Sequence, residues 1–272
     1  MLNGDKSFNN FKIHTQYSIC EGAVKIDDLA SFCKEQKIKS IGICDSHNLC
    51  GALEFSEKIS KIGTQPIIGT QINFSLEGVI GKIPLFATTE IGYKNLIKLS
   101  SKSYLESNEK NDPYCNFEEL INLNQDLIIL TGTQFDLFGK LFKKNKLKKI
   151  EENLKRLKTI LKDRLYIEIQ RHNEPGENSY EKYLINLSKI LEITLIATQE
   201  IYYLDKDLFE AHDALICIGE KNFVNDSKRK KYSDQHFFKS NEDLQKIFKD
   251  IPEALENNYN FPYRFSFKPK KS

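Results

Sequence analysis

Apolar and polar positions along the chain predict strands that alternate with helices. Seven short apolar runs have the length expected of strands: residues 11–14, 40–44, 66–74, 85–87, 127–131, 165–169 and 194–198. Amphipathic stretches between these runs predict helices: residues 26–36, 51–62, 93–104, 146–161 and 181–192. Because strands that follow crossover helices pair in parallel, the pattern predicts an α/β fold, either a (β/α) barrel or a doubly wound open sheet.

The same pattern divides the chain into two parts. Residues 105–115 are polar and predict a loop, and from residue 206 onward the pattern predicts helices joined by polar segments. We therefore expect a barrel or sheet over residues 1–205 and a small helical extension over residues 206–272.

Composition indicates a folded protein with a substantial core. Of the 272 residues, 40% are hydrophobic, and 40 basic residues stand against 38 acidic ones for a formal net charge of +2. This balance excludes a polybasic DNA-coating protein and an acidic disordered tail. No apolar run approaches the ~18 residues of a membrane span, and the polar N-terminal residues lack the apolar core of a secretory signal. We expect a cytoplasmic protein that does not contact a membrane.

The six cysteines fit that compartment. They form no CxxC pair, and several lie in apolar patterns, where a reduced thiol acts as a small hydrophobic group. We therefore expect buried free thiols rather than a metal or redox centre.

Polar and ionisable residues follow the predicted strands. In both architectures the chemistry lies at the carboxyl ends of the strands, so these residues are candidates for a site. They are His14, residues 45–47, Gln71, residues 131–133, residues 170–172 and residues 199–200.

Eight segments resemble one known family in the same order. They are residues 11–23, 43–55, 66–69, 92–96, 166–172, 210–218, 238–240 and 252–257. The succession is similar to the PHP (polymerase and histidinol phosphatase) domain, and more narrowly to the N-terminal region of bacterial replicative DNA polymerase III alpha subunits. It spans roughly residues 8–267. The resemblance implies a distorted seven-stranded (β/α) barrel of PHP type at the front of a much longer polymerase.

The resemblance also implies a metal site. PHP enzymes gather His, Asp, Glu or Cys ligands around several cations, which activate a water and neutralise phosphate oxygens. Four corresponding positions keep a residue of ligand type: His14, Glu21, Asp45 and Glu200. Other corresponding positions have lost a competent donor: Lys12, Ser46, Gln71, Lys82, Thr133 and Tyr202.

Two of these replacements put an ammonium group where the cations would lie. A protonated lysine has no lone pair and repels a cation, so we expect Lys12 and Lys82 to form internal ion pairs. Their partners would be the remaining carboxylates, Glu21, Asp45 and Glu200. The segment is therefore predicted to contain no catalytic residue and to bind no metal or other cofactor. Mg²⁺ is expected only in the palm of the full-length polymerase.

The histidines leave one alternative open. A reduced metal site would use four residues, one of which, His47, is displaced by one position from the ligand pattern: His14, Asp45, His47 and Glu200. Of the other histidines, His172 is expected to brace a loop and His212 to lie on a helix surface or in its packing. The sequence pattern assigns no role to His236.

Two basic stretches allow two interpretations. Nine Lys or Arg residues occur between positions 140 and 158, and residues 228–231 form a second patch. They are either solvated helix and loop surface, or they contact the phosphate backbone of DNA or an acidic partner.

The resemblance favours one function over two others. It implies a scaffold within the alpha chain that packs against the rest of that chain and carries the proofreading exonuclease subunit. The alternatives are a stand-alone metal-dependent PHP phosphoesterase and an inert leftover of a damaged gene. The polymerase reaction would belong to the full-length protein, of which this chain is expected to be a fragment.

Overall fold

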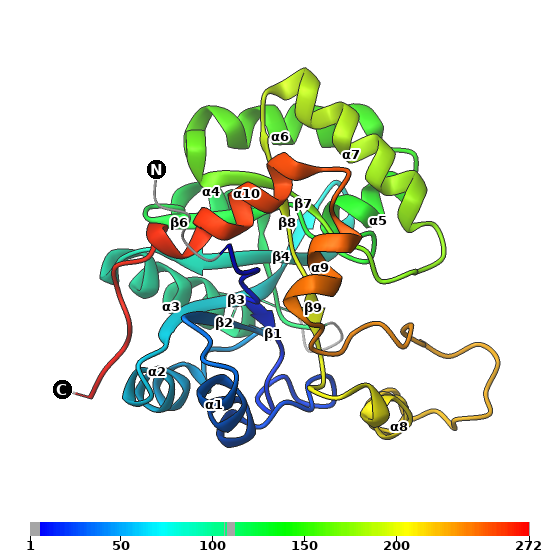
Figure 1. Cartoon of the computed structure of the whole chain (residues 1–272). Coiled ribbons are helices and arrows are strands. Elements are labelled where there is room, and N and C mark those ends of the chain that lie inside the picture. Colours follow the sequence, from blue (N-terminus) through cyan, green and yellow to red (C-terminus); the bar gives the residue numbers. More distant parts are fainter. Residues whose placement is uncertain (1–5, 106, 108–111, 272) are drawn as a thin grey trace.

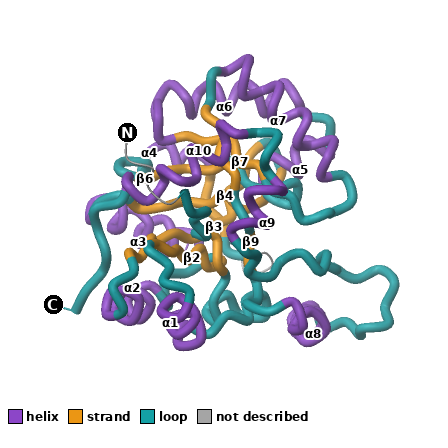
Figure 2. Tube along the Cα trace, in the orientation of Figure 1, coloured by secondary structure: helices purple, strands orange, loops and turns teal. Residues whose placement is uncertain are grey.

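The computed structural model describes residues 6–105, 107 and 112–271, with strands at the centre and helices on the outside (Figures 1 and 2). Six strands follow one another in one hydrogen-bonded sheet, in the order β2, β3, β4, β6, β7, β8. Their bounds are β2 (Ser40–Ser46), β3 (Gln65–Leu76), β4 (Val79–Ala87), β6 (Leu127–Leu130), β7 (Leu165–Ile169) and β8 (Thr194–Ala197).

Strand β1 (Lys12–Ile13) lies outside this sheet and connects its first strand to the segment that follows its last strand. It pairs in parallel with β9 (Glu200–Ile201), which follows β8 along the chain. On its other side the carbonyl of Asn10 accepts a hydrogen bond of 2.9 Å from the amide of Gly42 in β2. The strands therefore form an irregular barrel within a mixed α/β fold, which confirms the predicted fold class.

The pairing of β4 differs from the parallel pattern expected from sequence. It lies antiparallel to both β3 and β6, whereas β2–β3, β6–β7 and β7–β8 are parallel. Glu77 and Gly78 have φ values of 54° and 72°, and this left-handed pair makes the two-residue turn that favours an antiparallel hairpin. Strand β4 begins at Val79, earlier than the predicted strand at residues 85–87.

Helices cover the outside of the barrel, and the five predicted between strands are present. They are α1 (Ile26–Glu35), α2 (Ala52–Lys61), α3 (Glu90–Leu105), α6 (Leu147–Leu161) and α7 (Glu177–Leu191). Helices α4 (Phe117–Asn122) and α5 (Leu137–Lys143) were not predicted, because six or seven residues are too few to show a helical period. The described part of the chain also contains three 3₁₀ turns: η1 (Lys162–Arg164), η2 (Lys206–Leu208) and η3 (Phe261–Arg264).

The predicted loop at residues 105–115 is only partly described. Leu105 ends α3, and β5 (Tyr114–Asn116) pairs in parallel with β3, so both ends of the stretch belong to regular elements. Residues 106 and 108–111 lie outside the described residues.

The predicted extension contains α8 (Phe209–Glu220), α9 (Asn241–Ile247) and α10 (Pro252–Asn260). Leu244 and Phe248 belong to the same buried cluster as the strands, and α10 lies across the sheet in Figure 1. Phe261 stacks on Phe11 with ring centroids 4.1 Å apart. The last helices thus share the barrel's core, while a domain boundary at residues 205/206 stays a prediction.

Four of the six cysteines are buried, as expected: Cys33, Cys44 and Cys217 are free thiols, and the Cys115 thiol donates a hydrogen bond to the Leu99 carbonyl. Cys20 and Cys50 are exposed free thiols instead, in the turns that follow β1 and β2. Within the described residues, no helix is long and apolar enough to cross a membrane.

The packing of Phe261 predicts one stability difference. Replacing Phe261, which is 1% exposed, in the variant Phe261→Ala should lower the free energy of unfolding by about 3–5 kcal/mol, because it opens a cavity among four aromatic rings. Tyr263→Ala is the control, since Tyr263 is 87% exposed and should change stability by less than about 0.5 kcal/mol. Urea unfolding followed by circular dichroism measures both. Equal effects of the two variants would contradict the shared core.

Candidate functional site

The side chains singled out in the sequence lie at one end of the barrel. Parallel strands carry their carboxyl ends on the same side, so residues far apart in the chain meet there. Six of them belong to strands: Lys12 (β1), Asp45 and Ser46 (β2), Gln71 (β3), Lys82 (β4) and Glu200 (β9). The other four stand directly after strands or in the turn after β1: His14, Glu21, Thr133 and Tyr202.

Lys12 is fully buried between two carboxylates. Its Nζ lies 3.0 Å from Oε1 of Glu168 and 3.6 Å from Oε1 of Glu200, and the Lys12 side chain is 0% exposed. Burial lowers the pKa of Lys12, but the two carboxylates outweigh it and raise the pKa above its ordinary value. The group is therefore an ammonium ion whose charge is compensated inside the protein.

Glu200 of β9 contacts a side chain from β3 and the residue that follows β1. Its Oε1 accepts hydrogen bonds from the Gln71 side chain at 2.6 Å and pairs with Nε2 of His14 at 2.9 Å. Burial raises the pKa of Glu200, but Lys12 and His14 together hold it well below its ordinary value. Gln71, the replacement for a ligand, thus donates to a carboxylate that a metal would otherwise neutralise.

Lys82 makes the second internal ion pair, with Glu21. Its Nζ lies 2.7 and 2.8 Å from the two oxygens of the Glu21 carboxylate and 2.8 Å from Oγ of Ser46. Ser46 also donates to Glu21, and the Tyr232 hydroxyl donates to it at 3.3 Å. Burial raises the pKa of Glu21, but the charge of Lys82 above all lowers it far below its ordinary value.

Asp45 differs from its expected role as an ion-pair partner of a lysine. Its Oδ1 accepts from the Thr15 amide at 2.6 Å and the Ser18 hydroxyl at 2.7 Å, and its Oδ2 accepts from the Thr15 hydroxyl at 2.8 Å. Burial raises the pKa of Asp45, and these hydrogen bonds partly oppose that rise. Asp45 therefore fixes the turn after β1, since short neutral donors within that turn reach the carboxylate first.

Thr133 lies at the rim and donates hydrogen bonds to Asp136, an acid that was not among the residues predicted for the site. Its amide and hydroxyl donate to Oδ2 of Asp136 at 2.7 and 3.0 Å. Burial raises the pKa of Asp136 to about 6. Glu168 was missed too, although a glutamate inside the apolar strand β7 was a usable signal, because a buried charge needs a partner.

The histidines and Tyr202 form an aromatic cluster beside the ion pairs. Tyr202 stacks on His14 at 4.6 Å and on His212 at 5.3 Å, and His172 stacks on His236 at 4.1 Å. His212 is buried and pairs with the Glu21 carbonyl at 2.8 Å, which is the packing role expected for it.

His172 and His236 hold backbone and loops in place. Nε2 of His172 accepts from the Glu200 amide at 3.3 Å, and burial followed by the charge of His236 keeps the pKa of His172 well below its ordinary value. His236 pairs with the Glu200 carbonyl and with the Glu174 carboxylate, each at 3.2 Å. His172 thus braces a loop, as predicted. His236 has the same structural role, although the sequence pattern assigned it none.

His47 stands apart from the remnants with which it was grouped as an alternative metal site. Its backbone has a φ of 64°, and its buried Nδ1 has no hydrogen-bond partner among the described protein atoms. Burial lowers the pKa of His47 to about 4, and the Lys82 charge adds to this effect. The observed contacts of His14, Asp45 and Glu200 are made without it.

The residues present do not fit a multinuclear metal centre. The carboxylates of Glu21 and Glu200 are engaged by ammonium groups, and both oxygens of Asp45 are engaged by hydroxyl and amide donors. Among the described residues, no group of three or more His, Cys, Asp or Glu side chains is arranged to hold a metal ion. A cation entering here would have to displace a lysine from its carboxylate.

A cavity of about 530 Å³ opens above these ion pairs. Lysines from both basic stretches of the sequence line it, since Lys140 and Lys143 come from α5 and Lys230 and Lys231 from the loop after α8. Phe135 and Tyr232 stand in its wall, with ring centroids 6.5 Å apart. The fold therefore joins two basic patches that are far apart in the chain.

Comparison with known proteins agrees with this barrel and rim. The family model described as "PHP domain" matches residues 10–172, more than half of the chain. The chain belongs to the PHP domain family. This confirms the family resemblance inferred from the ordered motifs.

Individual relatives within this family share one name. The chain is 33% identical over 272 residues to the DNA polymerase III subunit alpha of Caulobacter vibrioides, covering 96% of this chain and 24% of that protein. It is 34% identical over 261 residues to the protein of the same name from Rickettsia bellii, covering 96% and 22%. The chain thus spans about a quarter of the length of these relatives.

One solved structure with a related shape is an amidohydrolase from Chromobacterium violaceum. The TM-score is 0.46 at 8% sequence identity, over 76% of this chain and 96% of that one.

Removing the buried ammonium should destabilise the barrel in a pH-dependent way. Lys12→Met leaves the Glu168 and Glu200 carboxylates buried without their cation, which should lower the free energy of unfolding by about 3–5 kcal/mol at pH 7. Without Lys12 the pKa of Glu200 rises above its unfolded value, and a buried acid of that kind costs stability only while ionised. The difference from wild type should therefore shrink as the pH falls from 7 towards 4.

The control is Lys6→Met, since the Lys6 side chain is 65% exposed and pairs with Glu256 at the surface. Urea midpoints at several pH values, read by circular dichroism, compare the three proteins. A Lys12→Met variant as stable as Lys6→Met, or one whose deficit does not change with pH, would contradict the role given to Lys12.

Proposed function

We propose that the chain is the N-terminal PHP region of a replicative DNA polymerase III alpha subunit, where it acts as a structural scaffold. The observation that carries this proposal is Lys12, a buried cation paired with Glu168 and Glu200 where the family resemblance places a metal ligand. The relatives named DNA polymerase III subunit alpha, which match 96% of the chain, support it as well. DNA synthesis and its Mg²⁺ would then belong to other parts of the longer chain.

The two ion pairs explain how such a site could hold the barrel together without metal. Lys12 of β1 joins Glu168 of β7 to Glu200 of β9, where the barrel closes irregularly. Lys82 of β4 ties the turn that contains Glu21 to the opposite wall. Each lysine therefore supplies, through the covalent chain, a positive charge that PHP enzymes obtain from bound cations.

We further propose that the rest of the alpha chain and the proofreading exonuclease subunit are its protein partners. Exposed apolar side chains support a docking surface of this kind: Ile19 is 82% exposed, Ile218 71% and Phe223 79%. The turn with Ile19 lies against α8, because a Cβ added to Gly219 would come within 2.6 Å of Cβ of Cys20. These side chains thus belong to one region around α8.

We also propose that the protein is located in the cytoplasm.

The stand-alone phosphoesterase is the alternative. It is favoured by membership of the PHP family and by the four residues of ligand type that remain, His14, Glu21, Asp45 and Glu200. It is disfavoured because the three carboxylates are already engaged by lysines or by the turn after β1.

Metal content separates the two functions. The purified chain, dialysed after exposure to Zn²⁺ or Mn²⁺, should retain far less than one metal ion per chain and should not hydrolyse p-nitrophenyl phosphate above background. A matched control is the double variant Lys12→His/Lys82→His, which restores imidazole donors at both lysine positions. Stoichiometric metal in the wild-type chain, together with metal-dependent hydrolysis, would establish the phosphoesterase instead.

We also propose that the lysine-lined cavity contacts the phosphate backbone of DNA. Three lysines that line it have no ion pair with a carboxylate among the described residues: Lys140, Lys143 and Lys231. A fourth, Lys230, lies 3.9 Å from the Glu21 carboxylate, which is already paired with Lys82. Burial lowers the pKa values of Lys140, Lys143 and Lys230, so a phosphate that replaces lost hydration would bind favourably there.

Binding of a duplex oligonucleotide, followed by fluorescence anisotropy, should therefore weaken steeply as salt increases. Replacing the four cavity lysines with methionine should reduce the slope of log affinity against log salt by up to about 4, or about one for each lost phosphate contact. Lys148→Met/Lys155→Met, on exposed positions of α6, is the control. Equal slopes of log affinity against log salt in both variants would contradict the DNA contact and would indicate that the basic stretches are solvated surface.

A further inference from the structure

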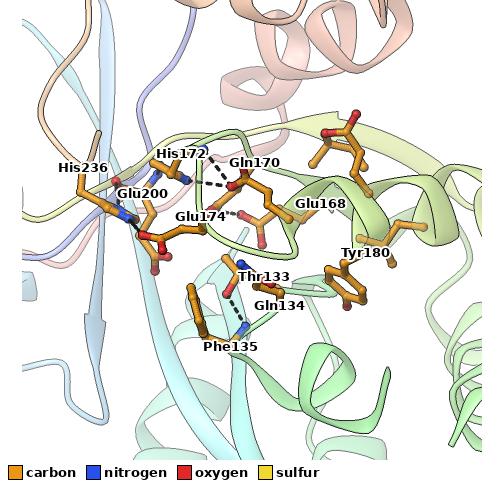
Figure 3. Close-up of a pocket in the computed structure, with 15 residues that line it drawn as sticks. Thr133, Gln134, Phe135, Glu168, Gln170, His172, Glu174, Tyr180, Glu200 and His236 are labelled. Atoms are coloured by element: carbon orange, nitrogen blue, oxygen red, sulfur yellow. Dashed lines mark hydrogen bonds and ion pairs between the residues drawn. The ribbon is translucent and has the colours of Figure 1, made fainter. Parts of the chain in front are cut away.

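A second, smaller cavity lies beside the ion pairs (Figure 3). Its volume is about 30 Å³, and it is lined by the segment after β6, the segment after β7 and one face of α7. The large cavity shares Thr133, Gln134, Phe135 and Glu200 with it as lining residues. The two cavities are thus adjacent.

Unpaired polar atoms gather around this compartment. Both amide atoms of Gln134, Oε1 of Gln170 and the hydroxyl of Tyr180 are buried without a hydrogen-bond partner among the described protein atoms. The three residues are only 4%, 7% and 4% exposed. Buried polar groups are almost always hydrogen-bonded, so four unpaired atoms around one cavity indicate a bound partner.

The chemistry of these atoms identifies the partner. The Gln134 amide nitrogen is a donor, whereas the Gln134 and Gln170 carbonyl oxygens are acceptors and the Tyr180 hydroxyl is both. A cation satisfies only acceptors and an anion only donors, whereas water satisfies both kinds. The nearby Glu168 carboxylate is already held by Lys12 and by the Gln170 and Thr198 side chains, which leaves it little capacity for a cation.

We propose that this cavity is a binding site for two internal water molecules that hydrogen-bond to Gln134, Gln170 and Tyr180. The volume fits, since one buried water needs roughly 10–15 Å³ of such space, and four unpaired atoms give each water two protein partners. Water reaches the site from the large cavity past Gln134, which lines both spaces.

The waters position the central ion pair. The Gln170 side-chain nitrogen donates to Oε1 of Glu168 at 2.8 Å and to the Thr198 hydroxyl at 2.9 Å. With its carbonyl oxygen held by water, the Gln170 amide is fixed in the orientation that keeps its nitrogen on Glu168. Glu168 in turn faces Lys12, so the hydrated cavity supports the ion pair through one intermediate side chain.

Deuteron or oxygen-17 magnetic relaxation dispersion counts such long-lived waters in solution. Tyr180→Phe should lower the dispersion amplitude by about the contribution of one water, and Gln134→Met/Gln170→Met/Tyr180→Phe by about two. Tyr183→Phe is the matched control on the same helix, because Tyr183 does not line this cavity and its loss should leave the amplitude unchanged. Equal amplitudes for the wild type and Tyr180→Phe would overturn the proposal.

Thermal unfolding provides a second test that does not need the triple variant to fold. In a hydrated cavity Gln134→Met removes hydrogen bonds to water and should lower the melting temperature. In a dry cavity the same substitution relieves an unpaired amide and should raise the melting temperature, which would also overturn the proposal.

Discussion

An ammonium group buried away from water must be surrounded by carboxylates, and the rim of this barrel is arranged around that requirement. Lys12 is 0% exposed and lies within 3.6 Å of two glutamates that come from different strands. Neither the lysine nor the glutamates could remain buried as ions alone, because an isolated charge in the interior is strongly unfavourable. The positions of β1, β7 and β9 therefore depend on one another where the barrel closes.

The carboxylates around Lys12 are also compensated by neighbouring side chains. Gln71 and His14 complete the hydrogen bonding of Glu200, and Lys82 compensates Glu21 on the opposite wall. In a PHP enzyme, bound cations would neutralise carboxylates at this end of the barrel. Here the cations are side chains, which cannot dissociate and which present no Lewis acid to a substrate. A rim of this kind ties the strands of the barrel to one another through charged side chains.

Sequence reasoning anticipated most of the barrel because its strands are short apolar runs separated by amphipathic helices. It misjudged the direction of β4, since a two-residue turn at Glu77 and Gly78 reverses the chain without a crossover helix. At the site, the lysines at ligand positions correctly predicted buried ion pairs. Their partners were predicted only in part. Glu168 was not recognised, although its charge inside an apolar strand requires a partner, and Asp45 accepts hydrogen bonds from the neighbouring turn instead of pairing with a lysine. The meeting of the two basic stretches at one cavity depends on tertiary packing that no local pattern encodes.

The ionisation state of Lys12 is the property that decides whether a buried ammonium ion organises this rim. Nitrogen-15 NMR of the lysine side chains across an alkaline pH titration reports each Nζ separately. We expect Lys12 to keep the chemical shift of an ammonium ion at a pH where exposed lysines have begun to lose their protons, because Glu168 and Glu200 raise its pKa above the ordinary value. A Lys12 that titrates below the exposed lysines, or that is neutral at pH 7, would contradict this expectation.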